Sequence, residues 1–256
     1  MIDLHCHILP GVDDGAKTLD ESVEMAKVAV REGITHILAT PHHMNRHWYN
    51  EKQDVIQRVN DLQIELDRLG IELTIFPGQE VRLYGDIITD IEDDKILFTD
   101  EQQQYILIEF PTETIPSYAE RLFFDLQSYG KTPIIVHPER NHEILKNPNR
   151  LKSFVDKGAL AQLTAASYTG GFGNKIQKLS KQLIEANLVH FIASDAHNVK
   201  NRAFHLQEAH KKLSKEYGTS KLNTFQAVTI ALINGDLVVA PETRDVKKPF
   251  LSKWFK

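Results

Sequence analysis

The chain has little cysteine, no long apolar run and no excess of positive charge. Its 256 residues include one cysteine, Cys6, which excludes a disulfide framework and any zinc site built from cysteines alone. No segment approaches the ~18 consecutive apolar residues of a membrane-spanning helix. The N-terminus lacks the basic region and apolar stretch of a secretory signal. We therefore expect the protein to be cytoplasmic.

The charge balance argues against a general nucleic-acid binder. The sequence has 30 Lys and Arg against 35 Asp and Glu, a net charge of −5, whereas such proteins need a basic surface. It also shows no basic groove interleaved with aromatic residues. A metal-dependent phosphodiesterase or exonuclease is therefore a minor alternative. The chain does contain 12 histidines, and their positions carry the functional argument.

Short β-rich runs alternate with amphipathic helical stretches, which is typical of an α/β fold with a parallel sheet. Strands are predicted at residues 2–7, 35–40, 71–76, 105–110, 132–137, 160–163 and 189–194. Helices are predicted at residues 18–33, 51–69, 117–129, 175–186, 202–216 and 221–233. No linker or repeat divides the chain, so we expect one domain over 1–256, with 241–256 as a C-terminal tail. Seven β/α units favour a closed or nearly closed barrel, although an open doubly wound sheet would show similar local patterns.

Nearly every predicted strand ends in a histidine or a carboxylate, and barrel enzymes carry their chemistry at these ends. The first strand ends in His5-Cys6-His7, where a period of two places both imidazoles on one face. Buried charges at this density are tolerated only when they are paired or metal-bound. We predict a multinuclear metal site, the alternative being a polar rim held by ion pairs. The candidate ligands are His5, His7, Asp14, His42, Glu80, Glu109, His137, Asp195 and His197.

This ligand set is too large for one ion but suffices for two or three ions that share a carboxylate. Mixed imidazole and carboxylate donors suit Mn²⁺, Fe²⁺ or Zn²⁺ better than Ca²⁺, and Cys6 is expected to pack behind the site. Neighbouring ions at about 3.5–4 Å can hold a hydroxide and the oxygens of a tetrahedral substrate, which favours phosphate ester hydrolysis. Arg140 and Arg202 follow two of the strand ends and are candidates for binding phosphate oxygens. His43 and Arg46 are weaker candidates.

Four motifs resemble those of the PHP (polymerase and histidinol phosphatase) superfamily: His5-x-His7, Pro41-His42, His137-Pro-Glu-Arg140 and Ser194-Asp195-Ala196-His197. The opening stretch 1–15, Leu107–Phe110 and Val189–His197 more closely resemble bacterial protein-tyrosine phosphatases of capsule and exopolysaccharide operons. The match spans residues 1 to about 240. It implies a distorted seven-stranded (β/α) TIM-like barrel that holds up to three metal ions, usually Mn²⁺.

The resemblance also implies the role of each ligand. His5, His7, Glu80 and Asp195 would hold the first ion, Glu80 with Glu109 and His137 the second, and Asp14, His42 and His197 the third. The implied substrate is phosphotyrosine in the C-terminal tail of a bacterial tyrosine kinase, and the implied role is control of extracellular polysaccharide synthesis. A homo-oligomer is compatible with this family. The position of Arg46 is variable in such enzymes, so its role stays open.

A Cys-dependent tyrosine phosphatase needs an arginine six positions after its cysteine, but Val12 stands there, so the expected nucleophile is a metal-bound hydroxide.

Beside the phosphodiesterase or exonuclease, two further alternatives remain for the activity itself. A superfamily phosphatase acting on a small molecule such as histidinol phosphate would use the same metal site. A metal-stabilised scaffold subunit is the second alternative.

The C-terminal run 247–256 mixes four lysines with four large apolar residues. Packing on its own domain or on a neighbouring subunit is the main expectation for this segment. A contact with the membrane surface near the kinase is the alternative, because lysines are attracted to anionic lipid and aromatic residues to the interface.

Overall fold

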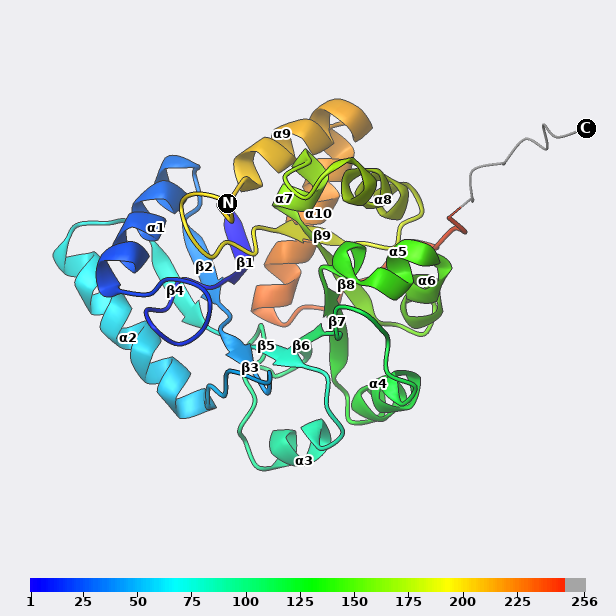
Figure 1. The fold of residues 1–256 in the computed structure, drawn as a ribbon, viewed down its shortest axis with the longest axis horizontal. Coiled ribbons are helices and arrows are strands. Elements are labelled where there is room, and N and C mark those ends of the chain that lie inside the picture. The colour runs from blue at the N-terminus through cyan, green and yellow to red at the C-terminus, as the bar shows by residue number, and fades with distance from the viewer. Residues whose placement is uncertain (247–256) are drawn as a thin grey trace, which may run out of the picture.

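The structure, a computed structural model, describes residues 1–246 and shows a ring of parallel strands surrounded by helices (Figure 1). Its strands form two sheets, in the orders β1-β2-β4 and β3-β5-β6-β7-β8-β9. Their bounds are β1 Ile2–Cys6, β2 His36–Ala39, β3 His42–His43, β4 Thr74–Pro77, β5 Glu80–Arg82, β6 Tyr105–Glu109, β7 Thr132–Val136, β8 Leu160–Thr164 and β9 Phe191–Ala193. The predicted α/β class with parallel strands is therefore confirmed.

Seven strand positions make up the ring, because two of them are interrupted. β3 continues the path of β2 beyond Thr40 and Pro41, and β5 continues that of β4 beyond Gly78 and Gln79. β2 pairs with β4, and β3 pairs with β5. The ring closes between β9 and β1, where the Asp195 N–H donates to the His5 carbonyl at 2.8 Å. This arrangement confirms the distorted seven-stranded barrel.

Six long helices occupy the predicted positions, with ends that differ from the predicted ones by four residues or fewer. They are α1 Leu19–Arg31, α2 Lys52–Arg68, α4 Ala119–Ser128, α8 Asn174–Glu185, α9 Leu206–Tyr217 and α10 Thr219–Asn234. Shorter helical segments were not predicted, because one or two turns give no measurable periodicity. These are α3 Ile87–Glu92, η1 Pro138–Arg140, α5 His142–Lys146, α6 Asn149–Val155 and α7 Ala165–Thr169.

The barrel interior is filled by apolar side chains and closed at one end by α10. Leu4, Leu38, Leu107 and Phe191 from four strands form one buried group with Leu232 of α10. The Tyr105 hydroxyl, at the start of β6, donates to the Asp236 carbonyl just beyond α10 at 2.7 Å. α10 therefore covers the end at which the strands begin, and in Figure 1 it is seen through the middle of the ring. The carboxyl ends of the strands lie at the opposite end.

The start of the predicted tail packs on the barrel. The Arg244 N–H donates to the Ala186 carbonyl at 2.9 Å, and the Val246 N–H donates to the Asn149 side chain at 2.9 Å. The contacts predicted for residues 247–256 lie outside the described residues. Within residues 1–246, no helix is both long enough and apolar enough to cross a membrane.

Candidate metal centre

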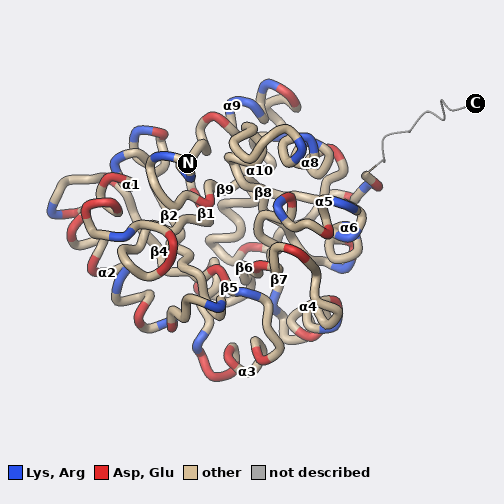
Figure 2. The backbone as a smooth tube through the Cα atoms, viewed as in Figure 1, with Lys and Arg blue, Asp and Glu red and all other residues tan. Residues whose placement is uncertain are grey.

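All nine candidate ligands lie in one connected cluster at the carboxyl ends of the strands. Each has a side-chain nitrogen or oxygen within 3.9 Å of a corresponding atom of another member. Figure 2 shows charged residues of both signs on the central strands around β5 and β6, as well as on the surrounding helices. The strand ends therefore converge as predicted.

His5, His7, Glu80 and Asp195 form a compact group at the centre. The Nε2 atoms of His5 and His7 are 3.2 Å apart, and both lie 3.4–3.5 Å from Glu80 Oε2 and 3.5 Å from Asp195 Oδ1. Atoms that share one ion at bond lengths near 2.1 Å lie roughly 3.0–3.4 Å from one another. The four side chains are therefore spaced like ligands of a single ion.

A second group forms around Asp14, in the loop after β1. Its Oδ1 atom lies 3.4 Å from His42 Nε2 and 3.3 Å from His197 Nε2. His7 joins these three residues in a set of four possible ligands. These contacts bring together the residues that the family resemblance assigns to the third ion.

A third group contains Glu80, Glu109 and His42. The Nδ1 atom of His42 lies 2.8 Å from Glu80 Oε2 and 3.9 Å from Glu109 Oε2. The resemblance implies His137 as the partner of Glu80 and Glu109, whereas this group contains His42. His137 Nε2 lies 2.6 Å from the other Glu80 oxygen, Oε1. Glu80 thus presents both oxygens to imidazoles, which suits a carboxylate that bridges two ions, and the assignment of His137 stays a prediction.

Several ligand atoms in this cluster are buried and make no contact with the geometry of a hydrogen bond, and these include His42 Nδ1 and Glu80 Oε2 despite their separation of 2.8 Å. Within the described residues they are Asp14 Oδ1, His42 Nδ1, Glu80 Oε2, Glu109 Oε2 and His197 Nε2. Buried polar atoms are normally paired, so a cluster of unpaired ones needs an explanation such as an ion. The atoms point toward one another, and their mixture of nitrogen and carboxylate donors fits Mn²⁺, Fe²⁺ or Zn²⁺. The residues present therefore fit a multinuclear metal site.

Burial and neighbouring charges shift the pKa values in opposite directions across the cluster. Burial, together with the negative charge of Glu80, raises the pKa of Glu109 to about 7. Burial, with the positive charge of Arg140, lowers the pKa of His137 to about 3. Burial is the largest single influence on His42 and lowers its pKa, but the charge of Glu80 and the contacts with the Asp14 and Glu80 carboxylates together raise that pKa to about 10. Groups of the same type thus titrate far apart, as is common in functional sites.

The backbone at two strand ends is unusual. His137, after β7, has a φ of 35°, and Asp195, after β9, has a φ of 55°. Non-glycine residues seldom adopt this left-handed region, and such residues cluster at functional sites. The two turns direct both side chains into the cluster rather than along the strand.

Hydrogen bonds behind the cluster orient two imidazoles. The Nδ1 atom of His7 is 2.7 Å from Asp13 Oδ2, and that of His5 is 2.9 Å from Gln162 Oε1. With each Nδ1–H donating to these oxygens, each Nε2 presents its lone pair to the shared centre. Asp13 also accepts from the His42 N–H at 3.1 Å. Asp13 and Gln162 are therefore positioning residues for the candidate ligands.

Arginines and an open cavity adjoin the cluster. Arg140 Nη2 lies 2.7 Å from Asp195, and Arg202 Nη1 lies 3.0 Å from Asp14. Both arginines, predicted from the sequence, line a cavity of about 330 Å³ that is also lined by His42 and Glu109. Arg202 Nη2 also lies 3.4 Å from Asp195. A guanidinium carries five N–H donors, so these ion pairs leave donors for phosphate oxygens.

A family model described as "Capsular polysaccharide synthesis, CpsB/CapC" matches residues 1–232. The chain belongs to this CpsB/CapC family. It is 50% identical to the tyrosine-protein phosphatase YwqE of Bacillus subtilis over 219 residues, 86% of each chain. It is 42% identical to the putative tyrosine-protein phosphatase CapC of Staphylococcus aureus, over 100% of this chain and 99% of the other.

Solved structures agree with this assignment. One chain from the crystal structures of YwqE of B. subtilis and CpsB of Streptococcus pneumoniae, both described as metal-dependent tyrosine phosphatases, superposes on the present chain with a TM-score of 0.93 at 45% identity. The match covers 97% of the present chain and 100% of the other. An organophosphorus hydrolase from Deinococcus radiodurans, with a TM-score of 0.52 to 0.54 and 11–12% identity, shares the fold alone. The family resemblance inferred from the sequence is confirmed.

In this member of the CpsB/CapC family, the residues that line the cavity include Arg82 and Trp48, which the sequence analysis did not predict. Arg82 Nη1 lies 3.4 Å from Glu109 Oε2. Arg82 stands two residues after Glu80 on β5, so a period of two could have placed both on one face. Trp48 lies in the loop after β3, where no periodicity applies.

The weaker candidates do not join the cavity. His43 is fully buried, and its ring packs against Tyr49 with centroids 5.0 Å apart. Arg46 is exposed and is not among the residues that line the cavity. Cys6 is also fully buried and lies behind the site, as predicted, with its thiol 3.6 Å from the Ala196 carbonyl.

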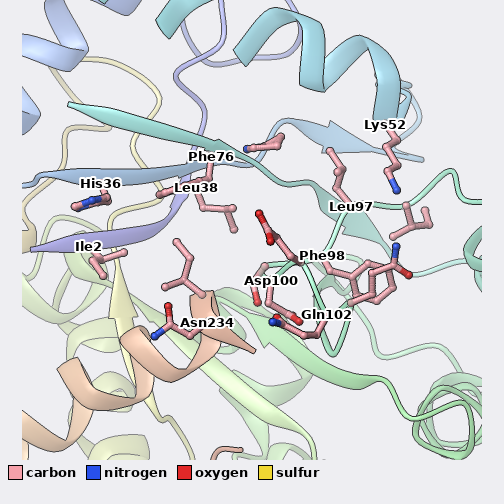
Figure 3. A pocket seen from close by; sticks show the side chains of 16 residues that line it. Ile2, His36, Leu38, Lys52, Phe76, Leu97, Phe98, Asp100, Gln102 and Asn234 are labelled. Carbon is pink, nitrogen blue, oxygen red and sulfur yellow. The ribbon is translucent and has the colours of Figure 1, made fainter. Parts of the chain in front are cut away.

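A larger cavity, of about 700 Å³, lies elsewhere (Figure 3). Apolar residues such as Ile2, Leu38 and Phe76 line it, together with Asn234 at the end of α10. None of the nine candidate ligands borders it. Size alone therefore does not locate the site, and the chemistry is placed at the smaller cavity.

Proposed function

We propose that this chain is a metal-dependent protein-tyrosine phosphatase. Its substrate in this proposal is phosphotyrosine in the tail of a bacterial tyrosine kinase, in the cytoplasm, and its role is to regulate capsule or exopolysaccharide synthesis. The observation that carries the proposal is the convergence of nine histidines and carboxylates in one cluster, six of which line the same cavity as Arg140 and Arg202. The names and crystal structure of the relatives support the same activity.

The proposed cofactor is Mn²⁺, up to three ions per chain, with Fe or Zn as substitutes. His5, His7 and Asp195 would hold the first ion together with Glu80, which would bridge to the second. Asp14, His42 and His197 would hold the third, and Glu109 and His137 would complete the second. Bound divalent ions of this type lower the pKa of coordinated water and neutralise charge that develops on a phosphoryl group.

The chain itself supplies substrate binding and orientation. Arg140 and Arg202 border the cavity, where their guanidinium groups can bind the non-bridging phosphate oxygens in a fixed direction. Their ion pairs with Asp195 and Asp14 hold these groups in place before substrate arrives. The fully buried Cys6 thiol lies outside the cavity lining, which agrees with a reaction that has no cysteine intermediate.

The test is phosphate release from a phosphotyrosine peptide and from histidinol phosphate, with metal-stripped protein and after Mn²⁺ is restored. We expect Mn²⁺-dependent release from the peptide. Arg140→Ala should reduce kcat/KM by about 10²-fold or more, because a charged contact to the transferring group is lost. Arg121→Ala, which removes an arginine with a 77% exposed side chain on α4, is the matched control and should retain activity. Preference for histidinol phosphate would refute the proposed substrate and keep the metal site.

A further inference from the structure

A large aromatic side chain stands beside the cluster without a ligand role. Trp48, in the loop between β3 and α2, is half-buried and lines the 330 Å³ cavity. Its indole stacks on the imidazole of His42, with ring centroids 5.4 Å apart and planes inclined by 14°. The loop is fixed nearby, because the Asn50 side-chain amide donates to the His42 carbonyl at 2.8 Å and to the Val12 carbonyl at 3.1 Å.

Core packing does not account for this tryptophan. Among residues 1–246, Trp48 belongs to neither buried apolar group, nor to the partly buried residues packed against them. The other aromatic residue lining the cavity, Phe110, is 5% exposed, and its ring packs against Phe123 and Phe154. Much of the remaining lining is polar, including Asn45, Thr112 and Asn141. Of the two residues Trp48 and Phe110 in the lining, Trp48 therefore provides the more accessible aromatic surface.

We propose that Trp48 is a specificity-determining residue that contacts the aromatic ring of the substrate. This proposal rests on the proposed phosphatase function. With the phosphate held by Arg140 and Arg202, the ester-linked group extends toward the cavity wall, where the indole offers a rigid flat surface. An aryl group can stack on this surface, whereas the alkyl group of a phosphoserine cannot. The cavity thereby selects aryl phosphates over alkyl phosphates.

The alternative role of Trp48 is to hold His42 in place. If stacking on His42 were its function, loss of the indole would weaken aryl and alkyl ligands equally. It would also lower Mn²⁺ content, because His42 is a candidate ligand. The ratio of aryl to alkyl affinity distinguishes the two roles.

Binding of phenylphosphonate and methylphosphonate to the Mn²⁺-loaded full chain, measured by titration calorimetry, tests the proposal. Both probes carry the same head group and neither can be hydrolysed. Trp48→Ala should weaken phenylphosphonate about 3- to 10-fold, the usual range for one aromatic contact. Methylphosphonate affinity and bound Mn²⁺ should not change, and Trp48→Phe should restore most of the phenylphosphonate affinity. With the phosphotyrosine peptide, Trp48→Ala should raise KM more than it lowers kcat.

Tyr49→Ala is the matched control, because Tyr49 is the next residue of the loop, is 54% exposed and does not line the cavity. Equal weakening of both phosphonates in Trp48→Ala, or no weakening of either, would overturn the role of Trp48. Failure of the wild-type chain to release phosphate from the peptide would instead overturn the proposed function. Failure of the Trp48 proposal and failure of the proposed function are thus distinguished by different measurements.

Discussion

At the scale of single residues, the candidate site depends on side chains that touch no substrate. Asp13 is 5% exposed and fixes His7 through Nδ1, while its two oxygens also accept from the backbone of Gly15 and His42. Loss of such a partner typically costs 10–100-fold in metal affinity, because the imidazole loses its orientation and part of its basicity.

We therefore expect Asp13→Ala to weaken Mn²⁺ binding by about 10- to 100-fold. The measurement is a Mn²⁺ titration of metal-stripped protein, read by calorimetry and by the metal content after gel filtration. Asp20→Ala, an exposed aspartate in the first turn of α1, should bind Mn²⁺ like the wild type. Unchanged affinity in Asp13→Ala would mean that His7 is not a ligand or needs no orientation.

The nine candidate ligands could be predicted because parallel strands bring their carboxyl ends to one edge, whatever their separation in the sequence. Gln162 and Trp48 could not be predicted in this way. Gln162 is an uncharged residue within β8, and its contact with His5 depends on how β8 and β1 face each other across the barrel. Trp48 depends on the path of an irregular loop. Both contacts are long-range consequences of the fold rather than local patterns.

At the scale of elements, the predicted strand bounds are accurate for continuous strands such as β6 and β7 and less accurate for the interrupted path of β4 and β5. The third strand was expected at 71–76, whereas β4 covers Thr74–Pro77. The Ile71 N–H still bonds to the Leu66 carbonyl at the end of α2, and the Leu73 N–H bonds to Ile71. These bonds form a tight connection that delays the strand. The short strand β5 was not predicted, because Gly78 and Gln79 separate it from β4 and it has only three residues.

The loop after β1 contains Asp13, Asp14 and Gly15, and it packs directly on the strand end. A Cβ atom at Gly15 would lie 2.6 Å from the Cβ atom of His7 and still closer to the His7 carbonyl oxygen. Gly15→Ala must therefore displace the loop or His7. We expect it to lower the free energy of unfolding by about 1–3 kcal/mol and to weaken Mn²⁺ binding.

Denaturant unfolding and the same Mn²⁺ titration measure both effects. Gly85→Ala is the matched control, because Gly85 is exposed and an added Cβ would meet no atom within 4 Å. A Gly15→Ala variant with wild-type stability and wild-type metal affinity would show that the loop adjusts without disturbing the ligands.

At the scale of the whole molecule, the number of β/α units in the sequence favours a barrel, but the sequence does not show whether the ring of strands closes. Closure depends on backbone hydrogen bonds between the two ends of the barrel, such as His7 N–H to Ala196 at 2.9 Å. Asp3 on β1 reinforces it by accepting from the Ser194 N–H at 2.9 Å. An open sheet would have the same local sequence patterns, so the distinction requires three-dimensional contacts.

In this closed ring, a metal ion held by the candidate ligands would cross-link the fold. The candidate ligands come from β1 and the loop after it, from β3, β5 and β6, and from the turns after β7 and β9. An ion bound to the native chain but not to the unfolded chain stabilises it by about 2.7 kcal/mol at 100 times Kd. For a chain of this length we expect saturating Mn²⁺ to raise the unfolding midpoint of metal-stripped protein by about 5–10 °C.

Differential scanning calorimetry with and without Mn²⁺ measures this shift. Asp195→Asn should lose most of it, because the carboxylate 3.5 Å from both His5 and His7 is replaced by a weaker, neutral ligand. Asp20→Asn, on the exposed face of α1, should keep the full shift. If Mn²⁺ stabilised Asp195→Asn as much as the wild type, the ion would bind elsewhere. The nine residues would then be a polar rim held by ion pairs, which is the alternative to a metal site that the sequence allows.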